Sequence, residues 1–145
     1  MVLPDDDSLA AVGTTAAFES VVPHIAVPDV VRTAEHYRDR LGFEIAGYWD
    51  GAEVHHDASR PAVFGIVRRG PVAIHLNAGK PRHRPSQAAA GAYDLYFNVD
   101  NLSLLDAELR AKGAEILEGP TIRPYGRREM VVRDCNGLIL AFGEA

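Results

Sequence analysis

Apolar positions along the chain alternate between the short spacing of strands and the longer spacing of helices. Residues 21–27 suit a strand, and Asp29 then precedes apolar positions at helical spacing. These positions are Val30, Ala34, Tyr37 and Leu41. An aspartate in this place caps a helix by accepting hydrogen bonds from free backbone N–H groups, and Gly42 suits the turn that ends one. The pattern predicts a helix over 30–40 and a strand over 43–49.

The same pattern occurs a second time. A strand is expected over 93–99, a cap at Asp100, a helix over 102–112 carrying Leu102, Leu105 and Leu109, and a strand from Ala114. Asp29, Gly42, Glu44 and Ile45 match Asp100, Gly113, Glu115 and Ile116 at a constant offset of 71 residues. Self-similarity at a fixed offset is typical of repeated supersecondary units that bury their apolar faces against one another.

Each unit is completed by two further predicted strands. In the first unit they span 61–67 and 72–77 around a turn at 68–71, and in the second 129–133 and 138–142 around Asp134-Cys-Asn-Gly137. The order in each unit is β-α-β-β-β, which places the chain in the α+β class. We therefore expect one domain over 20–144, made of two modules. The predicted segments are a tail (1–19), module 1 (20–77), a linker (78–91) and module 2 (92–144).

Composition narrows the possible partners. The 145 residues carry a formal net charge of −5, which argues against non-specific nucleic-acid binding. The acidic run Asp5-Asp6-Asp7 is unlike a secretion signal, no stretch is long and apolar enough to span a membrane, and Cys135 is the single cysteine. We therefore expect a cytoplasmic protein with neither nucleic-acid nor membrane partners.

Several ordered motifs resemble the vicinal oxygen chelate superfamily, which includes glyoxalase I, extradiol dioxygenases, and fosfomycin- and bleomycin-resistance proteins. They are His24-Ile-Ala-Val-Pro-Asp29, Tyr37 with Leu41-Gly42-Phe43, Ala73-Ile-His-Leu76, Phe97-Asn-Val-Asp100, Gly126-Arg-Arg-Glu129 and Val132-Arg-Asp-Cys-Asn-Gly137. The family's closing turn usually has Asp-Pro-Asp-Gly where this chain has Asp-Cys-Asn-Gly. The resemblance implies two βαβββ modules whose mixed sheets curl into a cup with the helices outside, and a homodimer, because many members exchange modules between subunits.

Alternation along the predicted strands separates an apolar face from a partly polar one. The partly polar face carries Val22, His24 and Ala26, His75 and Asn77, Asp94, Tyr96 and Asn98, and Ile139 and Ala141. Two interpretations stay open from the residues alone: a solvated sheet face or the lining of a pocket. The resemblance favours the pocket.

Metal-dependent members of the superfamily place four ligands on the cup. The resemblance assigns these positions to Val22, His75, Asp94 and Ala141, and neither Val22 nor Ala141 has a ligating side chain. His24, two residues from Val22 on the same face, is the available substitute. We therefore expect no metal or other cofactor.

His75 and Asp94 remain as a polar pair with three possible roles. They form a structural pair, they offer a ligand one donor and one acceptor, or the histidine acts as a metal-free general base oriented by the aspartate. The aromatic residues of the strands and loops suit stacking on a flat ligand, although each of them also suits plain packing. The predicted ligand-binding residues are His24, Trp49, Phe64, His75, Asn77, Asp94, Tyr96 and Tyr125.

Other conspicuous motifs have simpler explanations. His55-His56-Asp57 is expected to be a solvated loop, because adjacent histidines point in different directions. Arg127-Arg128-Glu129 is expected to form an ion pair at a strand start.

These observations favour a metal-free small-molecule-binding protein of the bleomycin-resistance type. It would sequester a partly aromatic ligand, such as an antibiotic, in a cup at a dimer interface. The alternative is a metal-dependent enzyme of the superfamily (glyoxalase, dioxygenase, lyase or epimerase) with a reduced ligand set. A third hypothesis is a structural or regulatory protein whose cup is filled by its own side chains.

Overall fold

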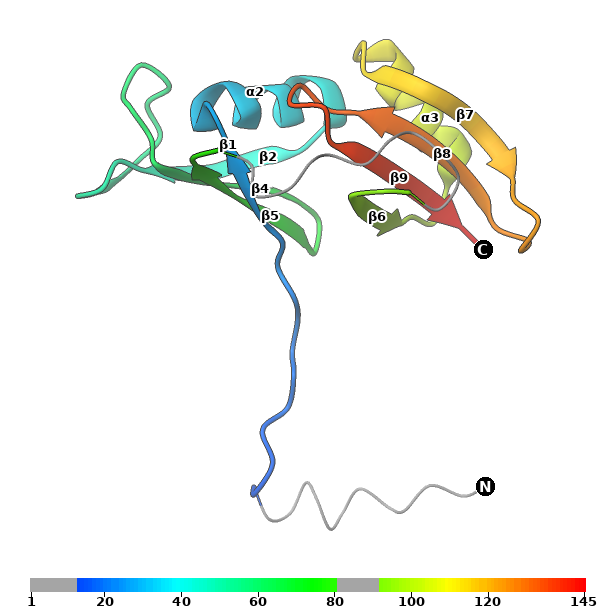
Figure 1. Cartoon of the computed structure of the whole chain (residues 1–145), viewed down its shortest axis with the longest axis horizontal. Coiled ribbons are helices and arrows are strands. Elements are labelled where there is room, and N and C mark those ends of the chain that lie inside the picture. Colours follow the sequence, from blue (N-terminus) through cyan, green and yellow to red (C-terminus); the bar gives the residue numbers. More distant parts are fainter. Residues whose placement is uncertain (1–12, 81–91) are drawn as a thin grey trace.

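A computed structural model describes residues 13–80 and 92–145, which form nine strands and two helices (Figure 1). The first module contains β1 (His24–Val27), α2 (Val30–Leu41), β2 (Glu44–Trp49), β3 (Val54–His55), β4 (Phe64–Arg69) and β5 (Val72–Ala78). The second contains β6 (Leu95–Asn98), α3 (Leu102–Ala111), β7 (Glu115–Ile122), β8 (Arg128–Arg133) and β9 (Ile139–Glu144).

Each module builds its own mixed sheet. The first sheet has the order β1-β5-β4-β2-β3 and the second the order β6-β9-β8-β7. In each module the first strand pairs in parallel with the last, and the other pairs are antiparallel. The predicted α+β class with two repeated modules is confirmed.

Three local features differ from the sequence-based expectations. Val54 and His55 form the short strand β3 within a segment expected to be a loop. β7 continues through Gly119 and Pro120, where a break was expected. A proline is tolerated there because β7 is an edge strand, and the register shifts between Glu118 and Thr121. The N-cap of α3 is Asn101 rather than Asp100, and its side chain accepts a hydrogen bond from the backbone N–H of Leu104.

Helix α2 forms for the reasons its sequence predicts. The Asp29 side chain accepts a hydrogen bond from Arg32 N at 3.0 Å, and Gly42 ends the helix in the left-handed conformation with a φ of 73°. Side chains at helical spacing are buried on one face, namely Val30, Thr33, Ala34, Tyr37 and Leu41. Burial of one large apolar side chain contributes about 1.5–3 kcal/mol, so this face anchors the helix to its sheet.

Both helices lie on the same side of the molecule (Figure 1). α2 contacts β2, β4 and β5, and α3 contacts β7, β8 and β9. One core cluster spans both modules on the helix side and includes Tyr37, Leu76, Leu109 and Leu140. The opposite faces of the two sheets therefore carry the remaining strand side chains.

The modules join through the helix side rather than through strand pairing. Tyr37 donates a buried hydrogen bond to Asp134 Oδ2 at 2.7 Å, and Asn136 donates to Thr33 Oγ1 at 3.0 Å. Arg69 forms a bidentate pair with Glu108, with N–O distances of 2.8 and 2.6 Å. The first two contacts hold the turn between β8 and β9 against α2, and the third joins β4 to α3, so one chain carries its two sheets side by side.

The N-terminal arm, residues 13–23, runs away from the body (Figure 1). Residues 13–21 are exposed, including Phe18 and Val21. Residues 1–12 of the predicted tail and 81–91 of the predicted linker lie outside the described residues. Within the described ranges no helix has both the length and the apolar character needed to cross a bilayer.

The buried tyrosines of module 1 give a matched test of the module junction. Tyr37→Phe removes the donor to a buried carboxylate, and we expect it to lower the free energy of unfolding by about 1.5–3 kcal/mol. The control is Tyr48→Phe, because the buried Tyr48 hydroxyl has no hydrogen-bond partner among the described residues. Its loss is expected to be neutral or stabilising. Urea unfolding of both variants measures the difference, and equal losses would contradict the assignment.

Candidate functional site

Five of the predicted residues meet on the open face of the first sheet. His24 lies opposite His75 in the β1–β5 register, and Phe64 lies opposite both Asn77 and Trp49. Residues directly opposite one another in neighbouring strands point to the same face. The sheet register therefore places His24, Trp49, Phe64, His75 and Asn77 on one surface, away from α2.

The two histidines contact each other directly. His75 Nδ1 and His24 Nε2 are 3.0 Å apart, and Asn77 Nδ2 lies 3.3 Å from His24 Nδ1. One hydrogen fits between the two facing ring nitrogens, so one of these nitrogens donates and the other accepts. Burial lowers the pKa of His75, and the neighbouring His24 lowers it further. Near neutral pH this face therefore offers hydrogen-bonding groups without a charge on His75.

Aromatic rings border the histidine pair. The Phe64 ring lies edge-on to His75 at 5.2 Å between centroids, and it lies 6.3 Å from His24. Trp49 stands at the end of β2 with 38% of its surface exposed. An exposed tryptophan beside phenylalanine and two imidazoles forms a flat, partly apolar surface suited to stacking.

The open face of the second sheet is organised around Glu129, which is 1% exposed. Its carboxylate accepts hydrogen bonds from three tyrosine hydroxyls: Tyr125 at 2.6 Å, Tyr96 at 2.7 Å and Tyr93 at 3.2 Å. Arg123 Nε adds a fourth donor at 3.1 Å. A buried carboxylate with four donors is satisfied, so the tyrosine rings around it are held in fixed orientations.

The same hydrogen bonds set the protonation states of Glu129 and Tyr125. Burial raises the pKa of Glu129, but the donors from Tyr125, Tyr96, Arg123 and Tyr93 outweigh burial and hold that pKa below its usual value. The hydrogen bond to Glu129 raises the pKa of Tyr125 to about 12. The carboxylate is therefore ionised and the Tyr125 phenol neutral at physiological pH.

Of the remaining predicted residues, Tyr96 belongs to β6 of the second sheet, and Asp94 directly precedes that strand. Asp94 Oδ2 accepts a hydrogen bond from Ile139 N at 2.8 Å, which fixes its carboxylate at the start of β9. Tyr96 is 39% exposed and Tyr125 is 59% exposed. The predicted residues thus form two groups, one at each sheet.

The conspicuous histidines and the charged residues at the start of β8 have defined partners. The described hydrogen-bond partner of His75 is His24, and Asp94 accepts a hydrogen bond from the backbone N–H of Ile139. His55 is buried and bonds to Pro61 O, so the expectation of a solvated loop residue is wrong for His55. His56 points in a different direction, as expected, and bonds to Ala46 O. At the start of β8, Arg128 forms an ion pair with Glu144, and Glu129 forms one with Arg123.

The tyrosine–carboxylate network escaped the sequence-based selection. Glu129, Tyr93 and Arg123 come from a strand, the segment before β6 and the loop after β7, so no local motif links them. Alternation of side chains along β8 could have indicated the position of Glu129. It puts Glu129 on the same face as Val131, and Val131 lies opposite Ala141 in the β8–β9 register. A charged residue on that face needs donors, and nearby tyrosines and arginines supply them.

The family's metal does not fit the side chains present. Of the four positions that resemblance assigns to ligands, Val22 and Ala141 have no donor atom, and His75 Nδ1 already contacts His24. Over the described ranges no three His, Cys, Asp or Glu residues are grouped so as to hold an ion. No metal-dependent step follows from this arrangement.

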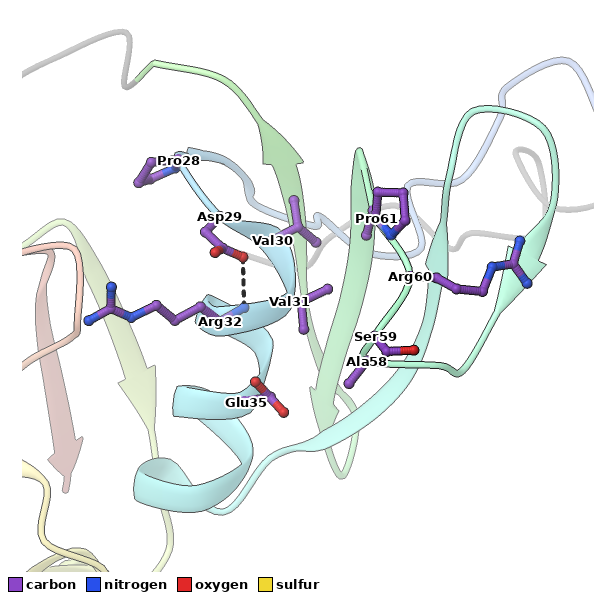
Figure 2. A pocket seen from close by; sticks show the side chains of 11 residues that line it. Pro28, Asp29, Val30, Val31, Arg32, Glu35, Ala58, Ser59, Arg60 and Pro61 are labelled. Atoms are coloured by element: carbon purple, nitrogen blue, oxygen red, sulfur yellow. Dashed lines mark hydrogen bonds between the residues drawn. The ribbon is translucent and has the colours of Figure 1, made fainter.

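A separate groove of about 530 Å³ lies on the helix side, between the start of α2 and the loop 58–62 (Figure 2). Its wall includes Asp29, whose carboxylate is already used to cap α2, and Arg60, which pairs with Asp50. None of the predicted ligand-binding residues lines it. The groove is therefore distinct from the two open sheet faces.

Two mixed sheets, with both helices on one side and polar and aromatic side chains on the other, define an α+β protein of two repeated modules. The family model for the Glyoxalase/Bleomycin resistance protein/Dioxygenase superfamily matches residues 17–142. The chain belongs to this superfamily, as its sequence motifs indicated.

Solved structures agree with this fold at low sequence identity. TioX from Micromonospora sp. ML1 has a TM-score of 0.66 and 17% identity, covering 88% of this chain and 98% of its own. A glyoxalase-related enzyme from Clostridium phytofermentans has a TM-score of 0.69 and 17% identity, covering 91% and 98%. A superfamily member from Sphaerobacter thermophilus DSM 20745 has a TM-score of 0.64 and 17% identity, and the match covers 89% of this chain and 98% of its own. A search of curated proteins finds no match.

The histidine pair predicts a pH dependence. His75 should titrate below the ordinary histidine pKa of 6.5, and His24→Gln should move its midpoint upward by removing the neighbouring imidazole. As pH falls through 6.5 the unfolded chain takes up a proton that folded His75 does not, so stability falls until the folded pKa is passed. NMR titration of the His75 ring measures both midpoints, and an unchanged midpoint in His24→Gln would contradict the coupling.

The Glu129 network predicts a phenol that is hard to ionise. Tyr125 should titrate at a pKa of about 12 and move back toward 10 in Glu129→Gln, because the charged acceptor is gone. NMR of ring-labelled tyrosine follows the titration, and Tyr125→Phe identifies the signal. A pKa near 10 in the unsubstituted protein would show that Tyr125 does not bond Glu129.

Proposed function

We propose that this protein is a homodimer that sequesters a small, partly aromatic ligand in a cup without a catalytic metal. Each cup is built from the open face of module 1 of one copy and that of module 2 of the other. The observation that carries the proposal is that organised aromatic and polar side chains gather on the faces of both sheets that lie away from the helices. The predicted ligand-binding residues belong to these sheets or adjoin them, and Trp49, Tyr96 and Tyr125 among them are exposed.

The arrangement of one chain supports the dimer. Its sheets join on the helix side through Tyr37–Asp134 and Arg69–Glu108, so both open faces look away from the helices. The arm 13–21 is exposed together with Phe18 and Val21. Water-exposed aromatic and apolar side chains of this kind are characteristic of surfaces that bury area against a partner or a ligand.

Fixed side chains support binding. Tyr96 and Tyr125 are anchored by their hydroxyls to Glu129, and Phe64 packs edge-on against His75. Side chains that are ordered before binding lose little further conformational entropy when a ligand stacks on them. Sequestration requires only that the ligand is buried in the cup and contacts a few polar groups that orient it. An antibiotic with flat rings can bind in this way.

The alternative, an enzyme with a reduced ligand set, draws on the His24–His75 contact. A neutral imidazole with a lowered pKa can accept a proton, so the pair offers one component of acid–base chemistry. The donor-free side chains of Val22 and Ala141 argue for the binding function instead. Turnover lost in His75→Ala would establish the enzymatic alternative.

The proposed cup predicts complementation between subunits. Phe64→Ala and Tyr96→Ala should each weaken binding of a bleomycin-type glycopeptide or another aromatic natural product by about tenfold or more, through lost stacking. A mixed dimer of the two variants contains one unaltered cup, because its wild-type module 1 and module 2 faces come from different chains. Titration calorimetry should recover tight binding at half the sites.

Matched measurements decide the result. Leu104→Ala, an exposed change on α3, should leave binding unaltered. Ligand at a hundredfold its Kd should stabilise the fold by about 2.7 kcal/mol in thermal unfolding. No stabilisation by any aromatic natural product in such a screen would overturn sequestration. Single variants that fail to complement in a verified mixed dimer would overturn the shared cup.

A further inference from the structure

Three basic residues surround the hairpin at the edge of the second open face, and two of them are neutralised. Arg123 pairs with Glu118 at 2.7 Å and with Glu129 at 3.1 Å, and Arg128 pairs with Glu144 at 2.9 Å. Arg127 makes no ion pair with any residue in the described ranges. A guanidinium retains its charge at all physiological pH values, so Arg127 is a fixed cation on this face.

The orientation of Arg127 is set by neutral groups. Its Nε donates to the Tyr96 hydroxyl at 2.9 Å, and its Nη2 donates to Asn98 Oδ1 at 2.9 Å. The Tyr96 hydroxyl in turn donates to Glu129 at 2.7 Å. The guanidinium is therefore held in place while its remaining N–H groups, including both on Nη1, have no described acceptor.

β9 leaves space for this arrangement at Gly143. A Cβ added there would overlap the Tyr96 hydroxyl and lie 3.3 Å from Arg127 Nη2. Any side chain at this position would displace the tyrosine, the arginine or both. The absence of a side chain at Gly143 is thus part of what positions the cation.

Flat ring surface lies beside the cation. The Arg127 guanidinium carbon is 5.6 Å from the Tyr96 ring centroid, and Tyr96 and Tyr125 are 39% and 59% exposed. The proposed facing surface contributes the Phe64 ring and His75, whose lowered pKa keeps it uncharged. A planar guanidinium with free N–H groups matches the two oxygens of a carboxylate.

We infer that Arg127 is the anion-recognising residue of the cup and that the ligand is a planar aromatic carboxylate. Its carboxylate binds the free N–H groups of Arg127, and its ring lies over Tyr96 and Tyr125. This inference rests on the proposed function and narrows the ligand to an anion. The net negative charge of the chain alone would instead favour a cationic ligand.

The test uses 2-naphthoate and its neutral isostere 2-naphthamide, titrated calorimetrically into the full-length protein. We expect naphthoate to bind at least about tenfold more tightly than naphthamide, the size of one charge-assisted hydrogen bond. Arg127→Met should remove that preference while leaving naphthamide affinity within about twofold. Arg127→Lys should retain only part of the preference, since it keeps the charge but not the planar fork.

Two further variants separate recognition from general structural damage. Tyr96→Phe keeps the ring but removes the hydroxyl that holds Arg127 Nε, and it should weaken naphthoate more than naphthamide. Arg110→Gln, an exposed arginine of α3 paired with Asp106, is the matched control and should change neither affinity. Circular dichroism and the unfolding midpoint verify that each variant is folded.

Each outcome bears on the inference. Equal binding of the two probes, no binding of either, or a preference for naphthoate that survives Arg127→Met would overturn it. The glycopeptide and natural-product screen is independent of these probes, so sequestration stands if that screen succeeds while the naphthoate preference fails. Failure of the screen together with a confirmed naphthoate preference would replace the drug ligand with a smaller aromatic acid.

Discussion

The buried hydrogen bond from Tyr37 to Asp134 is the interaction on which the arrangement of the modules depends. Asp134 also accepts the backbone N–H groups of Asn136 and Leu138, so the carboxylate that shapes the β8–β9 turn is the one that fastens this turn to α2. A buried carboxylate is costly unless every lone pair facing the interior is used. Local turn geometry and long-range module packing are therefore coupled through one side chain.

A second buried carboxylate, Glu129, organises the open face in the same way. Its four donors come from Tyr93, Tyr96, Arg123 and Tyr125, so one acidic residue sets the positions of three rings. Networks of this kind are rigid when fully satisfied. The first module has a smaller network on its face, in which His24 lies 3.0 Å from His75 and 3.3 Å from Asn77. The two faces thus differ in charge, because only the second is built around a carboxylate.

The sequence predicted what depends on local spacing. The α2 face of Val30, Ala34, Tyr37 and Leu41, its Asp29 cap and its Gly42 end follow from helical periodicity and are all present. It also assigned His24, His75 and Asn77 to one face by alternation. It did not predict the Glu129 network or the His24–His75 contact, because these depend on strand order and register, which bring together residues distant in sequence. The cap at Asn101 differs because Asn and Asp are near-equivalent caps and stand side by side.

The exposed arm has a consequence for handling the protein. Residues 13–21 are exposed. Accessible backbone of this type is the part of a protein that proteases cleave first. The rate of clipping near Phe18 is therefore a built-in reporter. Slow proteolysis would mean that the arm is protected by a binding partner. If proteolysis becomes faster when the protein is diluted, that partner is a second copy of the same chain.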